Sequence, residues 1–178
     1  MANVNRDDGF DEGGTLAEAC VGASAAAYMR HWKLDGINEL PAYFEHYDTP
    51  VKLVAAPQGS YAAWKLDRRT GGWRPADDLV DDVIGGIGGE IYVRSADAFV
   101  QHVEQLRGRY LRGEGEIFAL YERVRAIGEQ AVGAKRSCTS EEAALIKGIR
   151  RRTFVMFEKQ LQQAGDPAAD PTIASTAS

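Results

Sequence analysis

The chain has 178 residues, of which 44% are hydrophobic and 26% are charged. This composition excludes a disordered chain, and the length allows one folded domain whose core needs neither a disulfide nor a metal. The formal net charge of −5 is unevenly spread: residues 1–93 carry 8 Lys/Arg against 15 Asp/Glu, whereas residues 94–164 carry 13 against 9.

Targeting and redox signals are weak. The apolar stretch 16–29 is too short to span a membrane, and four acidic residues precede it where a secretory signal has a positive start. Cys20 and Cys138 lie outside any metal or redox spacing and are expected to be free thiols. The sequence therefore predicts a soluble, cytoplasmic protein that requires no cofactor.

The N-terminal part is expected to contain two helices. Residues 1–14 are polar and acidic and are expected to be disordered. Thr15 and Glu18 have the spacing of a capping box, which predicts a helix that ends near Lys33. A second, short helix is expected after Leu40-Pro41, and it carries the aromatic residues Tyr43, Phe44 and Tyr47.

Strand signals follow in the middle of the chain. Residues 51–56 and 61–66 are predicted strands, and a turn at 67–72 leads to a third strand that starts at Trp73, so that a meander forms with Trp64 and Trp73 as cross-strand neighbours. A short helix at 76–84 and a glycine-rich connection then precede a last strand at 90–94.

Three helices are expected in the C-terminal half. Ser95 caps the first. The second carries an apolar stripe from Ile117 to Ala131 and ends at Gly133. A capping box of Thr139 with Glu142 starts the third, which ends near Ala164. The Ala/Ser/Thr/Pro-rich residues 166–178 are expected to be a disordered tail.

Taken in order, these elements predict an α+β fold: an N-terminal helix, a small antiparallel sheet of three to four strands, then a three-helix unit. The expected single domain covers residues 15–165, of which 15–94 mix helix with sheet and 95–165 are helical.

No motif anchors catalysis. The glycines at 85–89 follow a helix and are followed by Glu90, which would repel a phosphate. His46 lies beside Glu45 and Asp48, but an exposed helix end explains that grouping better than a metal site. We therefore predict no catalytic residue and no metal, although acid–base pairs assembled by the fold leave no local signal.

An acidic patch is predicted at Asp77, Asp78, Asp81 and Asp82. On a helix these residues form like-charge pairs four positions apart, and such pairs are mildly destabilising. The patch is interpreted as a solvated face, or alternatively as a docking surface for a basic partner or a cation.

A basic patch is predicted at Lys135, Arg136, Lys147, Arg150 and Arg151. Residues 150–152 are all arginines with no Asp or Glu three or four positions away, so their own helix does not neutralise them. Arg152 lies on the line of Leu145, Ile149 and Met156, which places its stem at the apolar face. The patch either pairs with the acidic N-terminal half or remains free for a partner.

Three functions stay open at this stage. The leading hypothesis is a non-enzymatic protein–protein interaction or regulatory module, with self-association as one form of it, because apolar residues 154–157 cover most of the last helix's circumference. The alternative is nucleic-acid binding through the basic patch. The second alternative is an enzyme whose unrecognised site lies near residues 43–48 and the meander.

Overall fold

The computed structural model describes residues 40–85 and 91–176. The expected disordered segment 1–14, the helix that starts at Thr15 and the glycines at 86–89 lie outside the described residues.

Five strands form one antiparallel sheet in the order β4-β3-β2-β1-β5. They are β1 Ala42–His46, β2 Thr49–Ala55, β3 Tyr61–Leu66, β4 Trp73–Pro75 and β5 Ile91–Arg94. The first four follow one another as a meander, and β5 returns to pair with the free edge of β1. The sheet is therefore larger than the three to four strands expected.

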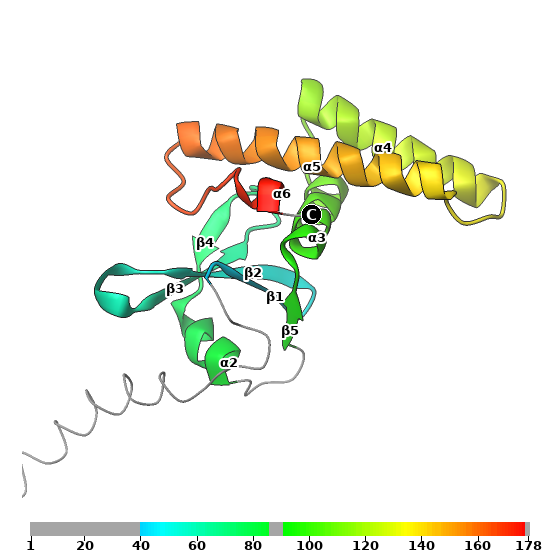
Figure 1. The fold of residues 1–178 in the computed structure, drawn as a ribbon. Helices are drawn as coiled ribbons and strands as arrows, with labels where there is room; N and C mark the ends of the chain where they lie inside the picture. Colours follow the sequence, from blue (N-terminus) through cyan, green and yellow to red (C-terminus); the bar gives the residue numbers. More distant parts are fainter. Residues whose placement is uncertain (1–39, 86–90, 177–178) are drawn as a thin grey trace, which may run out of the picture. The chain divides into compact units, whose positions relative to one another are not determined.

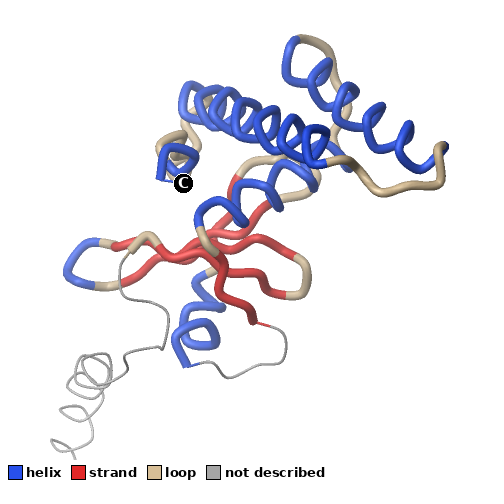
Figure 2. The backbone as a smooth tube through the Cα atoms, turned by 45° about the vertical axis from the view of Figure 1, so that its right-hand side comes forward, coloured by secondary structure: helices blue, strands red, loops and turns tan. Residues whose placement is uncertain are grey.

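The helices lie on both sides of this sheet (Figures 1 and 2). They are the short η1 Pro57–Gly59 and η2 Asp77–Leu79, α2 Val80–Gly85, α3 Ala96–Tyr110, α4 Glu116–Gly133, α5 Ser140–Gln163 and α6 Ile173–Thr176. Figure 1 shows α2 on one side of the sheet and α3, α5 and α6 on the other. The predicted α+β class is confirmed.

The long helices begin where their capping residues predict. The Ser95 hydroxyl accepts a hydrogen bond from the Ala98 amide at 3.2 Å, which satisfies a free N–H at the start of α3. Thr139 and Glu142 form the complete capping box at the start of α5. Beyond α5, Gly165 adopts a φ of +85°, which suits a residue without a side chain and turns the chain back.

The short aromatic helix expected after Pro41 is wrong: this segment is strand β1. It pairs with β2 on one side and β5 on the other, and each side chain lies on the face opposite to its neighbour's. Tyr43 packs against Phe99 of α3 with ring centroids 4.7 Å apart, while Phe44, 1% exposed, lies on the other face. Pairing on both edges outweighs the local signal of a proline at a helix start.

Trp64 and Trp73 are cross-strand neighbours, as expected. Trp73 lies opposite Leu66, and Trp64 lies opposite Pro75. The two tryptophans therefore share a sheet face as diagonal rather than directly opposite neighbours.

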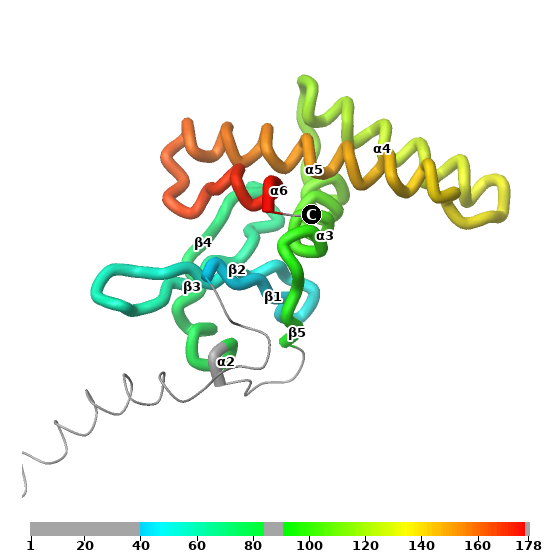
Figure 3. Tube along the Cα trace, viewed as in Figure 1, coloured from blue at the N-terminus to red at the C-terminus, as the bar shows by residue number. Residues whose placement is uncertain are grey.

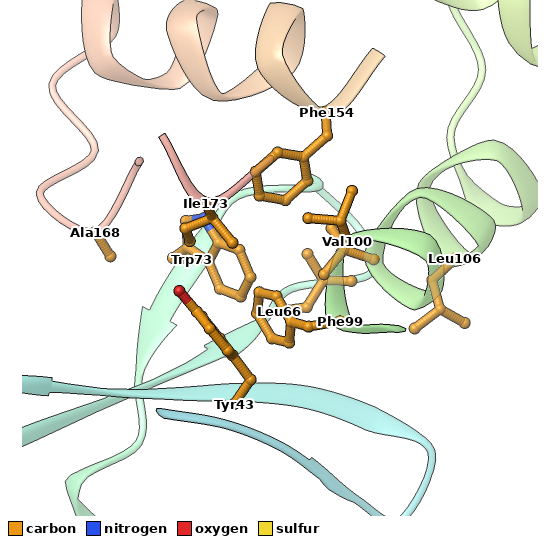
Figure 4. Close-up of a cluster of buried hydrophobic side chains, with 10 residues drawn as sticks. Tyr43, Leu66, Trp73, Phe99, Val100, Leu106, Phe154, Ala168 and Ile173 are labelled. Atoms are coloured by element: carbon orange, nitrogen blue, oxygen red, sulfur yellow. The ribbon is translucent and has the colours of Figure 1, made fainter. Parts of the chain in front are cut away.

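The tail after Gly165 differs most from its prediction. Ala168 and Ile173 are 9% and 2% exposed and belong to the main core cluster (Figure 4). The Trp73 amide donates to Asp166 at 2.9 Å, and the Asp170 amide donates to the buried Glu158 at 2.7 Å. Composition alone predicts disorder here, but these contacts order the segment.

The main core lies between the sheet and the helices on its α3 side. Side chains from the sheet, α3, α5 and the C-terminal segment point toward one another there (Figure 4). A second cluster of Ile117, Tyr121 and Phe157 joins α4 to α5, which run alongside each other (Figure 3).

Candidate functional site: an arginine-lined pocket

The predicted acidic patch lies on η2 and α2. The Asp77 carboxylate accepts from the Ala63 amide at 3.3 Å, and Asp78 lies 4.0 Å from the Lys65 ammonium. Asp81 is exposed and Asp82 is half-buried. Since α2 and α5 lie on opposite sides of the sheet, the acidic patch is not brought to the basic one (Figure 1).

The predicted basic patch is largely paired with nearby carboxylates. Arg136 forms a two-pronged ion pair with Glu142, with N–O distances of 2.7 and 2.8 Å. Asp97, in the first turn of α3, accepts from both Lys147 at 2.8 Å and Arg151 at 2.9 Å. The partners come from α3 and from the first turn of α5, not from the acidic N-terminal half.

The expected position of Arg152 at the apolar face is wrong. Its side chain is 62% exposed and pairs with Glu116, which is 58% exposed. The buried face of α5 instead follows Ile149, Thr153 and Phe157, so Arg152 falls beside that stripe rather than on it.

Arg150 is the patch residue with a different environment. It is half-buried and forms no ion pair within residues 40–85 and 91–176. Burial lowers the pKa of its guanidinium, and the nearby charge of Glu104 opposes that effect in part. Arg150 lines a cavity of about 220 Å³ together with Arg109 of α3 and Arg125 of α4. We call this cavity the arginine pocket.

The three arginines differ in how firmly they are held. Arg125 donates to the Gly108 carbonyl at 3.1 Å and to both oxygens of Glu122 at 2.6 Å. Arg109 is exposed, with its guanidinium 5.4 Å from the ring centre of Tyr110. Three helices thus each contribute one arginine to the lining of one cavity.

Glu104 is the acidic residue that lines the arginine pocket, and both of its carboxylate oxygens already accept hydrogen bonds. One of its oxygens accepts from Arg107 at 2.9 Å, and the other accepts from the Tyr121 hydroxyl at 2.9 Å and from the Thr153 hydroxyl. Burial raises the pKa of Glu104 and of Tyr121. Both Glu104 oxygens face inward partners, so this carboxylate does not neutralise Arg150 by a hydrogen bond.

Glu104 also belongs to a fully buried network of charged residues. Arg107, 1% exposed, also donates to Glu158 at 2.6 Å and to the Gly71 carbonyl at 2.7 and 2.9 Å. The Trp73 indole donates to Glu158 at 3.0 Å. Among the described residues, every buried side-chain nitrogen and oxygen has a hydrogen-bond partner. The network is therefore a satisfied framework that joins α3, α4 and α5 to the sheet.

Sequence reasoning found Arg150 but missed Arg109, Arg125 and the buried network. Arg109 and Arg125 resemble ordinary solvated helix residues, and only the packing of α3 on α4 brings them together. One local pattern points to the buried network: Glu104 and Arg107 are three positions apart on a helix, and each directly follows an apolar residue, Val103 or Leu106.

A second charged group lies near the sheet edge. The His102 ring has its Nδ1 3.4 Å from Glu45 and its Nε2 3.2 Å from Asp48, and Arg94 pairs with Glu45 at 2.7 Å. Glu45 and Asp48 thus face His102 rather than His46. In the part of the chain that the structure describes, no group of three or more His, Cys, Asp or Glu is placed to hold a metal.

The aromatic segment contributes to another cavity: Tyr43 lines it together with Leu40, Pro41 and Asp170, and its volume is about 330 Å³. Neither Tyr61 nor Trp64 is among the residues that line this cavity or the arginine pocket. The arginine pocket contains neither His nor Cys among its lining residues. Three of its lining residues are arginines, and a free guanidinium group can bind a planar oxyanion such as a carboxylate with two parallel hydrogen bonds.

Neither a protein-family model, a curated protein nor a solved structure matches this chain significantly. Among the described residues no helix is both long enough and apolar enough to cross a membrane.

Proposed function

We propose that this chain is a non-enzymatic interaction module that binds an acidic segment of a partner protein at the arginine pocket. The observation that supports the proposal is Arg150, a half-buried residue that forms no ion pair within residues 40–85 and 91–176 and that lines a cavity with Arg109 and Arg125.

The energetics favour an anionic ligand. A guanidinium that loses water without gaining a carboxylate is destabilised, which is why burial lowers the pKa of Arg150. A ligand carboxylate in the pocket would restore that interaction. Charge-assisted hydrogen bonds of this kind contribute about 1.5–3 kcal/mol each.

An acidic protein segment fits better than nucleic acid. Binding to a duplex relies on many phosphate contacts made by a row of free cations. Three residues of the predicted patch, Arg136, Lys147 and Arg151, are already paired with Glu142 or Asp97. A single cavity reached by three arginines suits one or two acidic side chains.

The test is a fluorescence anisotropy titration with two labelled peptides, one rich in Glu and one with Gln in place of every Glu. We expect the Glu peptide alone to bind, and Arg150→Gln to weaken its binding about tenfold because one charge-assisted contact is lost. Arg152→Gln is the matched control, since Arg152 lies on the same helix but outside the pocket.

Several results would reject the proposal. They are equal binding of the two peptides, absence of binding, or equal losses in the Arg150 and Arg152 variants. A DNA duplex that binds more tightly than the Glu peptide, with the same dependence on Arg150, would assign the pocket to nucleic acid instead. Circular dichroism of each variant confirms that it is folded.

A further inference from the structure

A second cavity adjoins the arginine pocket. It has a volume of about 340 Å³ and lies against the connection between α3 and α4. Leu111, Phe118 and Ala119 form an apolar wall, and the charged lining residues are Arg112, Glu114, Glu122 and Arg125. Leu111 and Phe118 are only partly buried, although they pack on the Ile117–Tyr121–Phe157 cluster. We call it the apolar cavity.

The two cavities share part of their lining. Tyr121 and Arg125 belong to both. The hydrogen bond from Arg125 to the Gly108 carbonyl, 3.1 Å long, lies where they meet. A ligand that places an acidic group among the arginines therefore has a neighbouring apolar surface within reach.

The spacing along α4 sets the size of such a ligand. Ala119 and Arg125 are six positions apart, which corresponds to about 9 Å along a helix axis. An extended peptide advances about 3.3 Å per residue. An acidic residue and an apolar residue about three positions apart would therefore reach both cavities.

We infer that the partner segment carries an apolar side chain about three residues from its acidic residue, and that this side chain enters the apolar cavity. This inference rests on the proposed function. It specifies the recognised chemistry as an acidic group followed or preceded by an apolar one, rather than negative charge alone.

The experiment compares two labelled peptides that share a Glu and differ in whether Leu or Ala stands three residues from it. For the wild-type chain we expect the Leu peptide to bind about tenfold more tightly, because the Leu side chain buries apolar surface in the cavity and the Ala side chain does not. Ala119→Leu fills the apolar cavity from an exposed helix position and should abolish that difference while binding of the Ala peptide is unchanged.

Ala126→Leu is the matched control. Ala126 is also exposed and lies two turns further along α4 on the same face, but it lines neither cavity. If both peptides bind in an Arg150-dependent way with equal affinity, or if the two Leu variants behave alike, the inference is wrong and the proposed function stands. If neither peptide binds, the proposed function itself fails.

Discussion

Lys52 illustrates how far a single residue can depart from its usual surroundings. It is 1% exposed, donates a hydrogen bond to the Ala168 carbonyl, and lies with its ammonium 3.9 Å from the ring centre of Trp73. Burial lowers its pKa from 10.5 to about 8, although the charge of Glu158 opposes the shift. The ammonium thus helps to hold the C-terminal segment in place, but its burial removes the water that would otherwise stabilise its charge.

This shift predicts that stability rises with pH above 8. Between pH 8 and 10.5 the unfolded chain keeps the Lys52 proton while the folded chain has lost it, so the free energy of unfolding rises by up to about 1.4 kcal/mol per pH unit. Below pH 8 both states are protonated and the slope disappears. Urea unfolding of wild type and Lys52→Met between pH 7 and 10 measures the effect.

The variant Lys52→Met should lose the slope, and Lys65→Met on β3 should keep it. The range stops at pH 10 because burial raises the pKa of Tyr43 to about 12, and above pH 10 that group reduces stability. A wild-type slope that persists in Lys52→Met would show that another group titrates.

Arg107 is expected to contribute strongly to the stability of the fold. Replacing it in Arg107→Met leaves Glu104 and Glu158 buried without their counter-charge, and we expect a loss of about 3–5 kcal/mol in the free energy of unfolding. Arg152→Met breaks an exposed ion pair and should cost less than about 1 kcal/mol. Similar losses in the two variants, measured by urea unfolding, would contradict the role given to the buried network.

Among the elements, the segment after α5 is the one whose order depends on distant partners. Its composition is that of a solvated tail, yet Ala168 and Ile173 complete the core against Tyr43 and Trp73 (Figure 4). The chain reaches that core because Gly165 turns it back and Asp166 accepts from the Trp73 amide.

Ile173→Ala tests that order. Truncating a buried Ile costs about 2–5 kcal/mol in a well-packed core. We therefore expect a clear fall in the urea midpoint, whereas Ser175→Ala at an exposed position should leave it unchanged. Equal midpoints for wild type and Ile173→Ala would mean that the segment is disordered in solution, as its composition predicts.

On the scale of the whole folded unit, the sheet separates the two charge clusters that the sequence singles out. The acidic residues of η2 and α2 lie on one side, and the basic residues of α5 lie on the other (Figures 1 and 2). Most of the basic ones find carboxylates on their own side, such as Asp97 and Glu142. Two patch residues have no such partner in the described part of the chain: Lys135, which is exposed, and Arg150, which lines the arginine pocket.

Local sequence signals were sufficient to predict the mixed class and the ends of the long helices. Ser95, the Thr139–Glu142 box and Gly165 act within one helical turn, so their signals are readable without knowledge of the fold. The strand at 61–66 was predicted for the same reason, since a turn bounds it on each side.

Long-range packing was needed for three other outcomes: residues 42–46 form a strand, Glu104, Arg107 and Glu158 are buried together, and Arg109 and Arg125 line one cavity with Arg150. Each of these outcomes depends on groups far apart in the chain: β1 becomes a strand because it has neighbours on both edges, and a charge becomes buried only when its counter-charge arrives from another element. Local sequence patterns do not encode contacts between elements that are far apart in the chain. The candidate site therefore follows from the packing of three helices and not from any motif.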